Sequence, residues 1–186
     1  KFFFSTDSLV PKCMAQFCDE VIERRMNIQW QGELRFETAF TDELLKKMAE
    51  AGCRNLIFGF ESANQRILDL MEKGTNLTNT LRILQTCARL GIGVNLQSFI
   101  GFPTESSEEA WETARFFLDH RTLLESISFG YFQLEKRTDV FQRPEVYDVE
   151  VLVDPDAHFH LFYPYNVRRG MSPEEVIDLY KAIKKV

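Results

Sequence analysis

The sequence has 186 residues, of which 45% are hydrophobic and 27% charged, and its formal net charge is −6. This length suits one ordinary domain, and the composition is that of a soluble globular protein. The negative net charge argues against a nucleic-acid-binding surface as the main feature, although a protein with this net charge can still carry a local basic patch. No apolar run approaches the roughly 18 residues of a membrane span, so no membrane partner is expected.

The four cysteines are Cys13, Cys18, Cys53 and Cys87, and they form no CxxC pair or repeated spacing. Such scattered cysteines predict reduced, mostly buried thiols in a cytoplasmic protein. We do not expect these four residues alone to bind a metal or a cluster.

Predicted strands and helices alternate along most of the chain. The first residues, "KFFFST", resemble the inside of a strand and lack an initiator Met, so we expect a piece of a longer protein. In the segments between the predicted strands, apolar residues recur at helical spacing. Residues 55–60 form a continuous apolar run, which is typical of a parallel sheet covered on both faces. The predicted strands are 2–5, 27–36, 55–60, 92–101 and 126–134. Helices are expected from Ser8, from the cap Thr41 to Gly52, around Ile67 and Leu68, from Thr78 to Gly91 and from Ser106. This alternation predicts an α/β fold with a parallel sheet.

The pattern changes after Glu135. Residues 135–171 are rich in aromatics, have no helical period and predict extended segments and loops. A last helix begins at Ser172, with Pro173 at its first position and Glu175 completing a capping box. We predict one domain, 1–186, with βα units over 1–134 and an irregular segment plus a helix over 135–186.

Polar residues occur at the end of each of the first four strands. In parallel α/β folds, ligands bind beyond the carboxyl ends of the strands. Asn95 and Gln97 alternate with Val94 and Leu96, so the two amides share one face. Either a ligand or neighbouring loops must satisfy such amides. The polar residues in question are Thr6, Asp7, Gln31, Glu33, Arg35, Glu61, Ser62, Asn95 and Gln97.

Four segments in this order resemble motifs of the radical S-adenosylmethionine (SAM) superfamily. They are "IQWQGELR", "AGCRNLIFGFES", the overlapping "FGFESANQRILDLMEKGT", and "FIGFPTES". The resemblance covers residues 1–134 and is closest to the subgroup that often carries a cobalamin-binding domain, with its methylthiotransferase and coproporphyrinogen-oxidase-like relatives. It implies a partial TIM-type (β/α) barrel of parallel strands. The family's first strand and its CxxxCxxC loop, which binds a [4Fe–4S] cluster, are missing, and Cys13 and Cys18 have the wrong spacing to replace that loop.

The resemblance also implies roles for individual residues. Glu61, with Ser62 beside it, matches the position that binds the ribose hydroxyls of SAM, and Gln97 matches a second ribose contact. Lys73 matches the cation that pairs with the methionyl carboxylate; alternatively, it only stabilises the C-terminus of its helix. The remaining expected contacts are Thr6 and Asp7 to the methionyl amino group, Gln31 and Arg35 to cofactor or substrate, and the turn at Gly101 and Pro103 to the adenine.

The function implied is the SAM-binding portion of a radical SAM enzyme, an oxidoreductase or transferase. With a [4Fe–4S] cluster in the full-length protein, it would generate a 5′-deoxyadenosyl radical for hydrogen abstraction or for methyl or methylthio transfer. Cobalamin in a separate domain is compatible with this subgroup. The substrate is not identified, and tRNA-modifying relatives leave nucleic acid open.

Two other functions stay open. The chain could be a non-catalytic nucleoside-binding module that has lost the cluster. It could also be part of a metal-dependent (β/α) hydrolase that uses Glu61 with His158 and His160, a pair whose rings share one face of a strand. No third ligand is evident, so we expect that histidine pair to be solvated or packed against aromatics.

The predicted first strand is apolar and has neither charge nor proline to protect its edge. We expect the chain's own aromatic segment or a second copy of the molecule to cover it.

Overall fold

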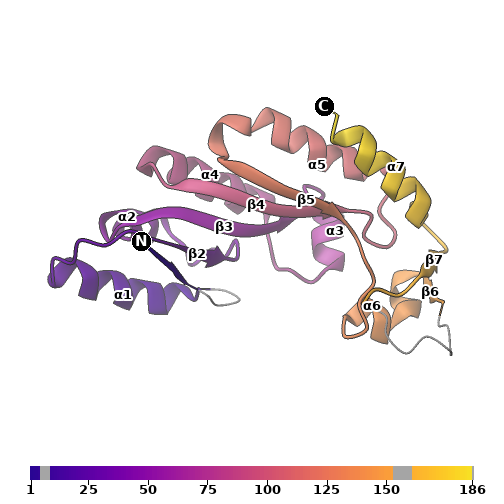
Figure 1. Cartoon of the computed structure of the whole chain (residues 1–186), viewed down its shortest axis with the longest axis horizontal. Helices are drawn as coiled ribbons and strands as arrows, with labels where there is room; N and C mark the ends of the chain where they lie inside the picture. Colours follow the sequence, from indigo (N-terminus) through magenta and orange to yellow (C-terminus); the bar gives the residue numbers. More distant parts are fainter. Residues whose placement is uncertain (5–8, 153–160, 186) are drawn as a thin grey trace. The chain divides into compact units, whose positions relative to one another are not determined.

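The computed structural model describes residues 1–4, 9–152 and 161–185. Two compact units appear in it, each built from several stretches of the chain (Figure 1). The first unit comprises Lys1–Glu61, Leu68–Ser98 and Phe117–Ser128; the second comprises Ser62–Ile67, Phe99–Phe116 and Phe129–Val186. The single-domain organisation predicted from the sequence stays a prediction.

A five-stranded sheet, in the order β1-β2-β3-β4-β5, contains all five predicted strands. The strands are β1 (Phe2–Phe4), β2 (Trp30–Leu34), β3 (Cys53–Glu61), β4 (Gly93–Ile100) and β5 (Ser126–Tyr131). The pairings β1–β2, β2–β3 and β3–β4 are parallel. The predicted α/β class and parallel sheet are confirmed, although β2 and β5 are shorter than the predicted 27–36 and 126–134.

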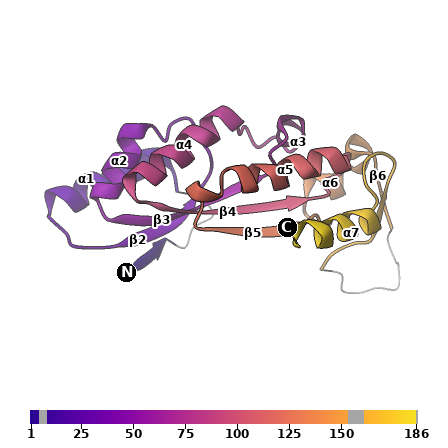
Figure 2. The same cartoon turned by 90° about the horizontal axis from the view of Figure 1, so that it is seen from above.

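In the first unit, helices α1 (Pro11–Glu23), α2 (Asp42–Glu50) and α4 (Leu77–Leu90) lie on the same side of the sheet (Figure 2). The predicted caps explain where they begin and end. The Thr41 hydroxyl accepts a hydrogen bond from the Leu44 N–H at 3.3 Å, and Gly91 ends α4 with a left-handed φ of 68°. This arrangement leaves the opposite face of the sheet for polar side chains.

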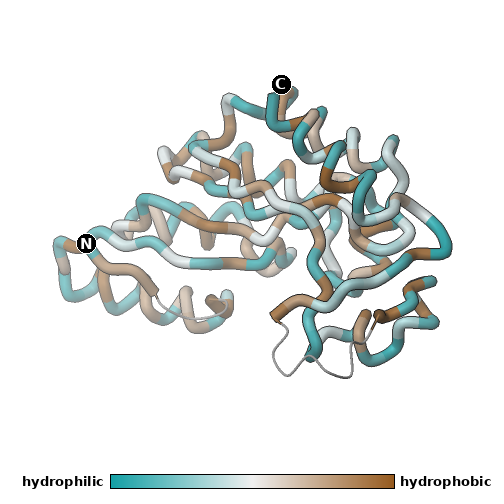
Figure 3. The backbone as a smooth tube through the Cα atoms, turned by 45° about the vertical axis from the view of Figure 1, so that its right-hand side comes forward, coloured by the Kyte–Doolittle hydropathy of each residue, from teal (hydrophilic) through white to brown (hydrophobic). Residues whose placement is uncertain are grey.

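The two faces of β3 and β4 differ in burial. Leu56, Phe58, Val94 and Leu96 are fully or almost fully buried. Their alternate neighbours Asn55, Ile57, Gly59 and Asn95 are half-buried, and Gln97 is exposed. The prediction that residues 55–60 are covered on both faces is therefore wrong for the described structure. The predicted separation of Asn95 and Gln97 from Val94 and Leu96 is confirmed. Figure 3 shows that hydrophilic and hydrophobic residues are mixed along the whole described backbone.

The second unit has a core of Ile100, Ala110 and Val176. Its helices include α5 (Ser107–Asp119), most of which belongs to this unit, and α7 (Pro173–Ile183). Both predicted capping boxes are present, at Ser106 with Glu109 and at Ser172 with Glu175. The short helix α3 (Gln65–Leu70) is divided between the two units.

The region after Glu135 contains more regular structure than the sequence predicts. A single helical turn, α6 (Asp139–Gln142), begins at the cap Thr138, and strands β6 (Val149–Val151) and β7 (Tyr165–Val167) pair antiparallel. One turn is too short to display a helical period, so the periodicity of the sequence could not reveal it. Two 3₁₀ turns complete the elements, at Arg121–Leu123 and Pro144–Tyr147.

Strand β1 forms one edge of the sheet. Phe4 packs edge-on against Phe17 and Trp30, with ring centroids 5.1 and 5.4 Å apart. Phe2 and Phe3 remain 60% and 47% exposed. The described residues therefore do not cover this edge, and self-association through it stays a prediction.

Candidate functional site: a pocket at the carboxyl ends of the strands

A pocket of about 340 Å³ lies at the carboxyl ends of β2, β3 and β4 in the first unit. We call it the Glu61 pocket. Four of the residues predicted as ligand contacts line it: Arg35, Glu61, Lys73 and Gln97. Polar side chains from two strands, β3 and β4, and from the loops after β2 and α3 thus meet at the end of the sheet where parallel α/β folds bind ligands. The complete lining is Glu33, Leu34, Arg35, Ile57, Gly59, Glu61, Lys73, Thr75 and Gln97.

Glu61 reaches this pocket because its backbone leaves the regular strand. Its φ is +64°, which is uncommon for a residue with a side chain, and the β3–β4 register shifts between Gly59 and Glu61. The Ser98 hydroxyl holds the bulge by donating to the Glu61 carbonyl at 2.7 Å. A Cβ on Gly59 would lie 3.0 Å from Glu61 Oε1, so glycine leaves room for the carboxylate to fold back. Such local strain often accompanies a functional site.

One cation pairs with the Glu61 carboxylate at the rim, and a second cation holds the backbone of the first. Lys73 Nζ lies 2.9 Å from Glu61 Oε1, in a pair whose side chains are 38% and 17% exposed. Arg35 Nη2 donates to the Lys73 carbonyl at 3.1 Å. Lys73 thus balances the charge of Glu61 directly, and Arg35 holds the Lys73 backbone.

Two of the described predicted contacts, Gln31 and Ser62, do not line this pocket. Gln31 lies near the beginning of β2 and lines another pocket. Ser62 is buried, and its hydroxyl lies 3.3 Å from that of Thr113 and accepts from the Asn64 N–H. Both interactions are local to the second unit, so the structure assigns Ser62 a packing role. Thr6 and Asp7 lie outside the described residues.

Gly101 also has a structural reason to be glycine. Its φ is +83°, and a Cβ there would lie 2.4 Å from Val176 Cγ1 of α7. The absence of a side chain therefore permits close packing in the second unit. This packing accounts for Gly101 without the predicted backbone approach to an adenine.

Two polar lining residues, Glu33 and Thr75, were not assigned as contacts from the sequence. Glu33 alternates with Gln31 and Arg35, so the period of two already placed it on the correct face. Thr75 carries no comparable signal, because it follows the left-handed Gly74 in a loop and only the path of that loop brings it to the pocket.

The "GFPTES" loop in the second unit is organised around a buried carboxyl. Glu105 is 1% exposed and accepts a hydrogen bond from the Gly101 N–H, while Oε1 has no partner among the described residues. Burial raises the pKa of the Glu105 carboxyl to about 7. Arg66 encloses the loop, bonding both the Thr104 carbonyl and the Glu109 carboxylate. The Arg66 side chain also holds the pKa of Glu109 below its ordinary value.

The cysteines do not form a cluster site. All four are free; Cys13 is exposed and the other three are buried. Burial raises the pKa of Cys18 and Cys87 to about 12 and that of Cys53 further still, which disfavours the thiolate needed for metal binding. No group of three metal-binding side chains occurs within the described ranges. The four cysteines therefore do not fit a [4Fe–4S] cluster. His158 and His160, the predicted histidine pair, lie outside the described residues.

The fold and the pocket define an α/β protein of the partial-barrel class, with a polar pocket at the carboxyl ends of its strands. Residues 17–117 match the model of the radical SAM superfamily, which is more than half of the chain. The chain belongs to this superfamily, whose members use SAM and a [4Fe–4S] cluster and have a partial TIM-barrel fold.

Two protein relatives and one solved structure indicate the breadth of the family. The chain is 30% identical over 116 residues to an uncharacterised methyltransferase of Pyrococcus horikoshii, a match covering 62% of this chain and 25% of that protein. It is 28% identical over 157 residues to the anaerobic magnesium-protoporphyrin IX monomethyl ester cyclase of Rubrivivax gelatinosus, covering 78% of this chain and 28% of that protein. The chain thus spans about a quarter of each relative's length.

The solved structure is TsrM, a radical SAM methyltransferase from Kitasatospora setae with cobalamin and a [4Fe–4S] cluster bound. Its TM-score is 0.71 at 14% identity, over 93% of this chain and 40% of TsrM. This likeness shows a shared fold. Among the described helices of the present chain, none is long and apolar enough to span a bilayer.

Proposed function

We propose that the Glu61 pocket binds SAM and that the chain is the SAM-binding part of a radical SAM enzyme. The observation that carries this proposal is the meeting of Arg35, Glu61, Lys73 and Gln97 in one pocket. The volume of about 340 Å³ is within the range of small-molecule sites. A carboxylate, two cations and an amide are the groups needed to bind a ribose diol and an amino-acid carboxylate together.

Each side chain has a defined task in this proposal. The Glu61 carboxylate accepts hydrogen bonds from the ribose hydroxyls, and Gln97 contributes a second polar contact to the sugar. Lys73 turns its ammonium from Glu61 toward the methionyl carboxylate, or bridges the two. Arg35 keeps the Lys73 loop in place through the Lys73 carbonyl. Charged hydrogen bonds of this kind contribute about 1.5–3 kcal/mol each.

When bound with a reduced [4Fe–4S] cluster, SAM supplies the radical or methyl-transfer chemistry of this superfamily. The 186 residues do not supply the cluster ligands, so the proposal assigns them binding, orientation and exclusion of water. The two relatives are named as a methyltransferase and a cyclase. These names describe different reactions. In the proposed enzyme, a separate domain would bind any cobalamin.

Calorimetric titration of the full-length protein with SAM tests the proposal directly. We expect saturable binding that the double variant Glu61→Ala/Gln97→Ala weakens. SAM binding that is unaffected by this variant would overturn the assignment of the pocket.

A non-catalytic nucleoside-binding module, which would use the same pocket, is the alternative. The gene sequence upstream of Lys1 separates the two functions. A CxxxCxxC motif within one βα unit of Lys1 supports the enzyme, and a full-length protein without any such motif supports the binding module.

We also propose a cytoplasmic location, supported by the four free cysteines. Cell fractionation with a periplasmic or secreted marker as control tests it.

A further inference from the structure

A buried hydroxyl interrupts an apolar row on β4. Val94, Leu96 and Ser98 occupy alternate positions of this strand, and all three are buried. Ser98 is 6% exposed, and a buried hydroxyl needs a hydrogen-bond partner to offset the loss of water. Its partner is the Glu61 carbonyl, to which Ser98 Oγ donates at 2.7 Å. The contact with Glu61 therefore accounts for a polar residue in an otherwise apolar row.

Ser98 lies opposite Glu61 because β3 contains one extra residue. Up to Gly59, which pairs with Gln97, the residues of the two strands pair one to one from Asn55 onward. The next pair joins Glu61 to Ser98, so one more residue of β3 is accommodated between the two pairs. A bulge of this kind disrupts the backbone ladder locally. As a result, a side chain that lines the Glu61 pocket lies beside one that is buried.

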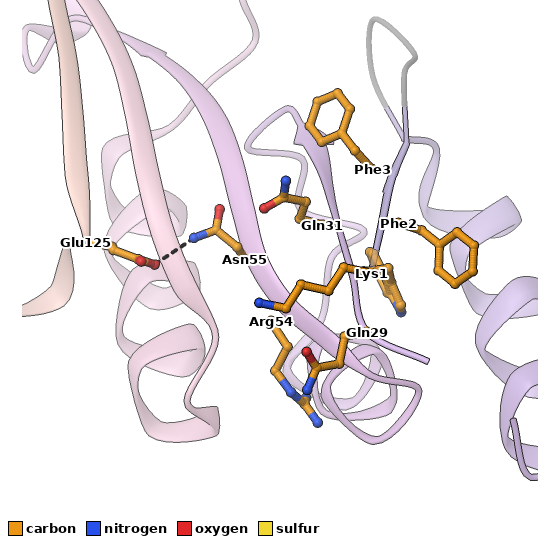
Figure 4. Close-up of a pocket in the computed structure, with 9 residues that line it drawn as sticks. Lys1, Phe2, Phe3, Gln29, Gln31, Arg54, Asn55 and Glu125 are labelled. Atoms are coloured by element: carbon orange, nitrogen blue, oxygen red, sulfur yellow. Dashed lines mark hydrogen bonds between the residues drawn. The ribbon is translucent and has the colours of Figure 1, made fainter. Parts of the chain in front are cut away.

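The other ends of the same strands are held in regular register by side chains. Figure 4 shows the Asn55 amide pointing toward the Glu125 carboxylate, to whose Oε2 the Asn55 Nδ2 donates at 2.6 Å. Asn95 Nδ2 in turn donates to Asn55 Oδ1. These bonds join β3 to β4 and to the residue before β5, near the beginnings of the strands. The irregularity is thus confined to the carboxyl ends, beside the Glu61 pocket.

The bulge sets the direction of the Glu61 side chain. Its φ of +64° is costly for a residue with a Cβ, so neighbouring contacts must maintain it, and the Ser98 hydroxyl is one of them. Gly59 leaves the necessary space, because a Cβ there would lie 3.0 Å from Glu61 Oε1. Lys73 Nζ pairs with the same oxygen at 2.9 Å. Ser98 and Gly59 therefore act on one carboxylate, the first through its backbone and the second through the space beside it.

We propose that Ser98 and Gly59 are positioning residues that make the Glu61 pocket selective for ligands with a vicinal ribose diol. This inference rests on the proposed function, in which the Glu61 carboxylate accepts hydrogen bonds from the ribose hydroxyls. Both hydroxyls of a diol reach one carboxylate only in a narrow range of orientations, so a displaced Glu61 side chain weakens both hydrogen bonds. Ser98 is not among the described residues that line the pocket, and it acts through Glu61.

Two nucleosides test this selectivity: adenosine, which has the diol, and 2′,3′-dideoxyadenosine, which lacks it. Competition calorimetry against SAM on the full-length protein measures the affinity for each. We expect the wild type to prefer adenosine. Ser98→Ala and Gly59→Ala should each weaken SAM and adenosine by about threefold to tenfold and leave 2′,3′-dideoxyadenosine unchanged. In a Glu61→Ala background, Ser98→Ala should have no further effect on SAM, because its influence passes through the missing carboxylate.

Matched controls remove or add the same groups elsewhere. Thr80→Val removes a buried hydroxyl from α4, and Gly130→Ala adds a methyl group where a Cβ meets no atom within 4 Å. Neither residue lines the Glu61 pocket, and neither substitution should change the preference for adenosine. Thermal unfolding is recorded for every variant. If Ser98→Ala does not fold, Gly59→Ala decides the question, because Gly59 has no left-handed φ.

The possible failures can be told apart. A wild type without a preference for adenosine would contradict the ribose contact in the proposed function. A wild-type preference that both Ser98→Ala and Gly59→Ala retain would overturn the present inference and leave the proposed function intact. Equal losses of affinity for the two nucleosides in these variants would also overturn it, since a merely structural role affects both ligands alike.

Discussion

The carboxylate of Glu61 and the ammonium of Lys73 meet 2.9 Å apart, although 12 positions separate the two residues. Glu61 stands at a bulge that ends β3, and Lys73 lies in the loop that follows α3. The pair places a fixed negative and a fixed positive charge at the rim of one pocket. Its contribution to ligand binding can be tested one partner at a time.

Replacement of Glu61 by alanine should weaken SAM binding by about one to two orders of magnitude, the loss expected for a charged hydrogen-bond acceptor. Titration calorimetry on the full-length protein measures this. Cluster content should not change, because no described cysteine lines the pocket. Glu23→Ala, an exposed substitution at the end of α1, is the matched control. An unfolded variant, or one with intact SAM affinity, would make Glu61 a structural partner of Lys73.

Lys73→Gln should weaken SAM but not adenosine, which has no methionyl carboxylate. A lysine that only stabilises the C-terminus of α3 would influence neither ligand. Competition binding with both ligands distinguishes these roles. A parallel loss of adenosine affinity would mean that Lys73 acts through the position of the Glu61 carboxylate instead.

The buried carboxyl of Glu105 should make stability depend on pH. Its pKa is raised from 4.5 to about 7, so the folded state favours the neutral form. The corresponding stabilisation is complete below pH 4.5 and is lost as the pH rises to about 7. Glu105→Gln keeps an oxygen acceptor for the Gly101 N–H but does not titrate. Denaturant unfolding should therefore show this variant gaining up to roughly 3 kcal/mol over the wild type between pH 5 and pH 8. Parallel pH profiles of the two proteins would contradict this.

The 186-residue chain should stay colourless after anaerobic treatment with iron and sulfide, and it should not cleave SAM. Three of its four cysteines are buried with raised pKa values, so they cannot converge on a cluster without unfolding. Iron analysis and visible absorbance measure the outcome. A stable absorbance band with a full complement of cluster iron would show that the cysteines do converge.

The exposed edge at β1 should cause the 186-residue chain to self-associate. Phe2 and Phe3 present apolar side chains on a strand whose outer backbone groups can pair with another strand. Sedimentation velocity should show concentration-dependent dimers, and Phe2→Lys/Phe3→Lys should shift the chain toward the monomer. A wild-type chain that stays monomeric throughout would refute this explanation of the edge.

Much of the fold could be predicted because local chemistry and global structure agree. The caps at Thr41, Ser106 and Ser172 mark helix starts through side-chain hydrogen bonds that span three residues. The alternation of Asn95 and Gln97 with Val94 and Leu96 likewise assigns two faces to β4. The predicted ends of β2 and β5 were less accurate than the predicted existence of these strands. The irregular backbone before β2 and after β5 has the same kinds of residues as the strands, so the sequence did not mark where the strands end.

Residue types at short spacing were enough to predict the order of strands and helices and the family to which the chain belongs. Which polar residues meet depends on how the strands and loops are arranged in space. Gln31 and Arg35 share a face of one strand, yet they line pockets at opposite ends, and Ser62, adjacent to Glu61, is buried against Thr113. Register, the bulge at Glu61 and the loop that brings Thr75 to the pocket depend on contacts between distant segments, and local spacing carries no information about those contacts.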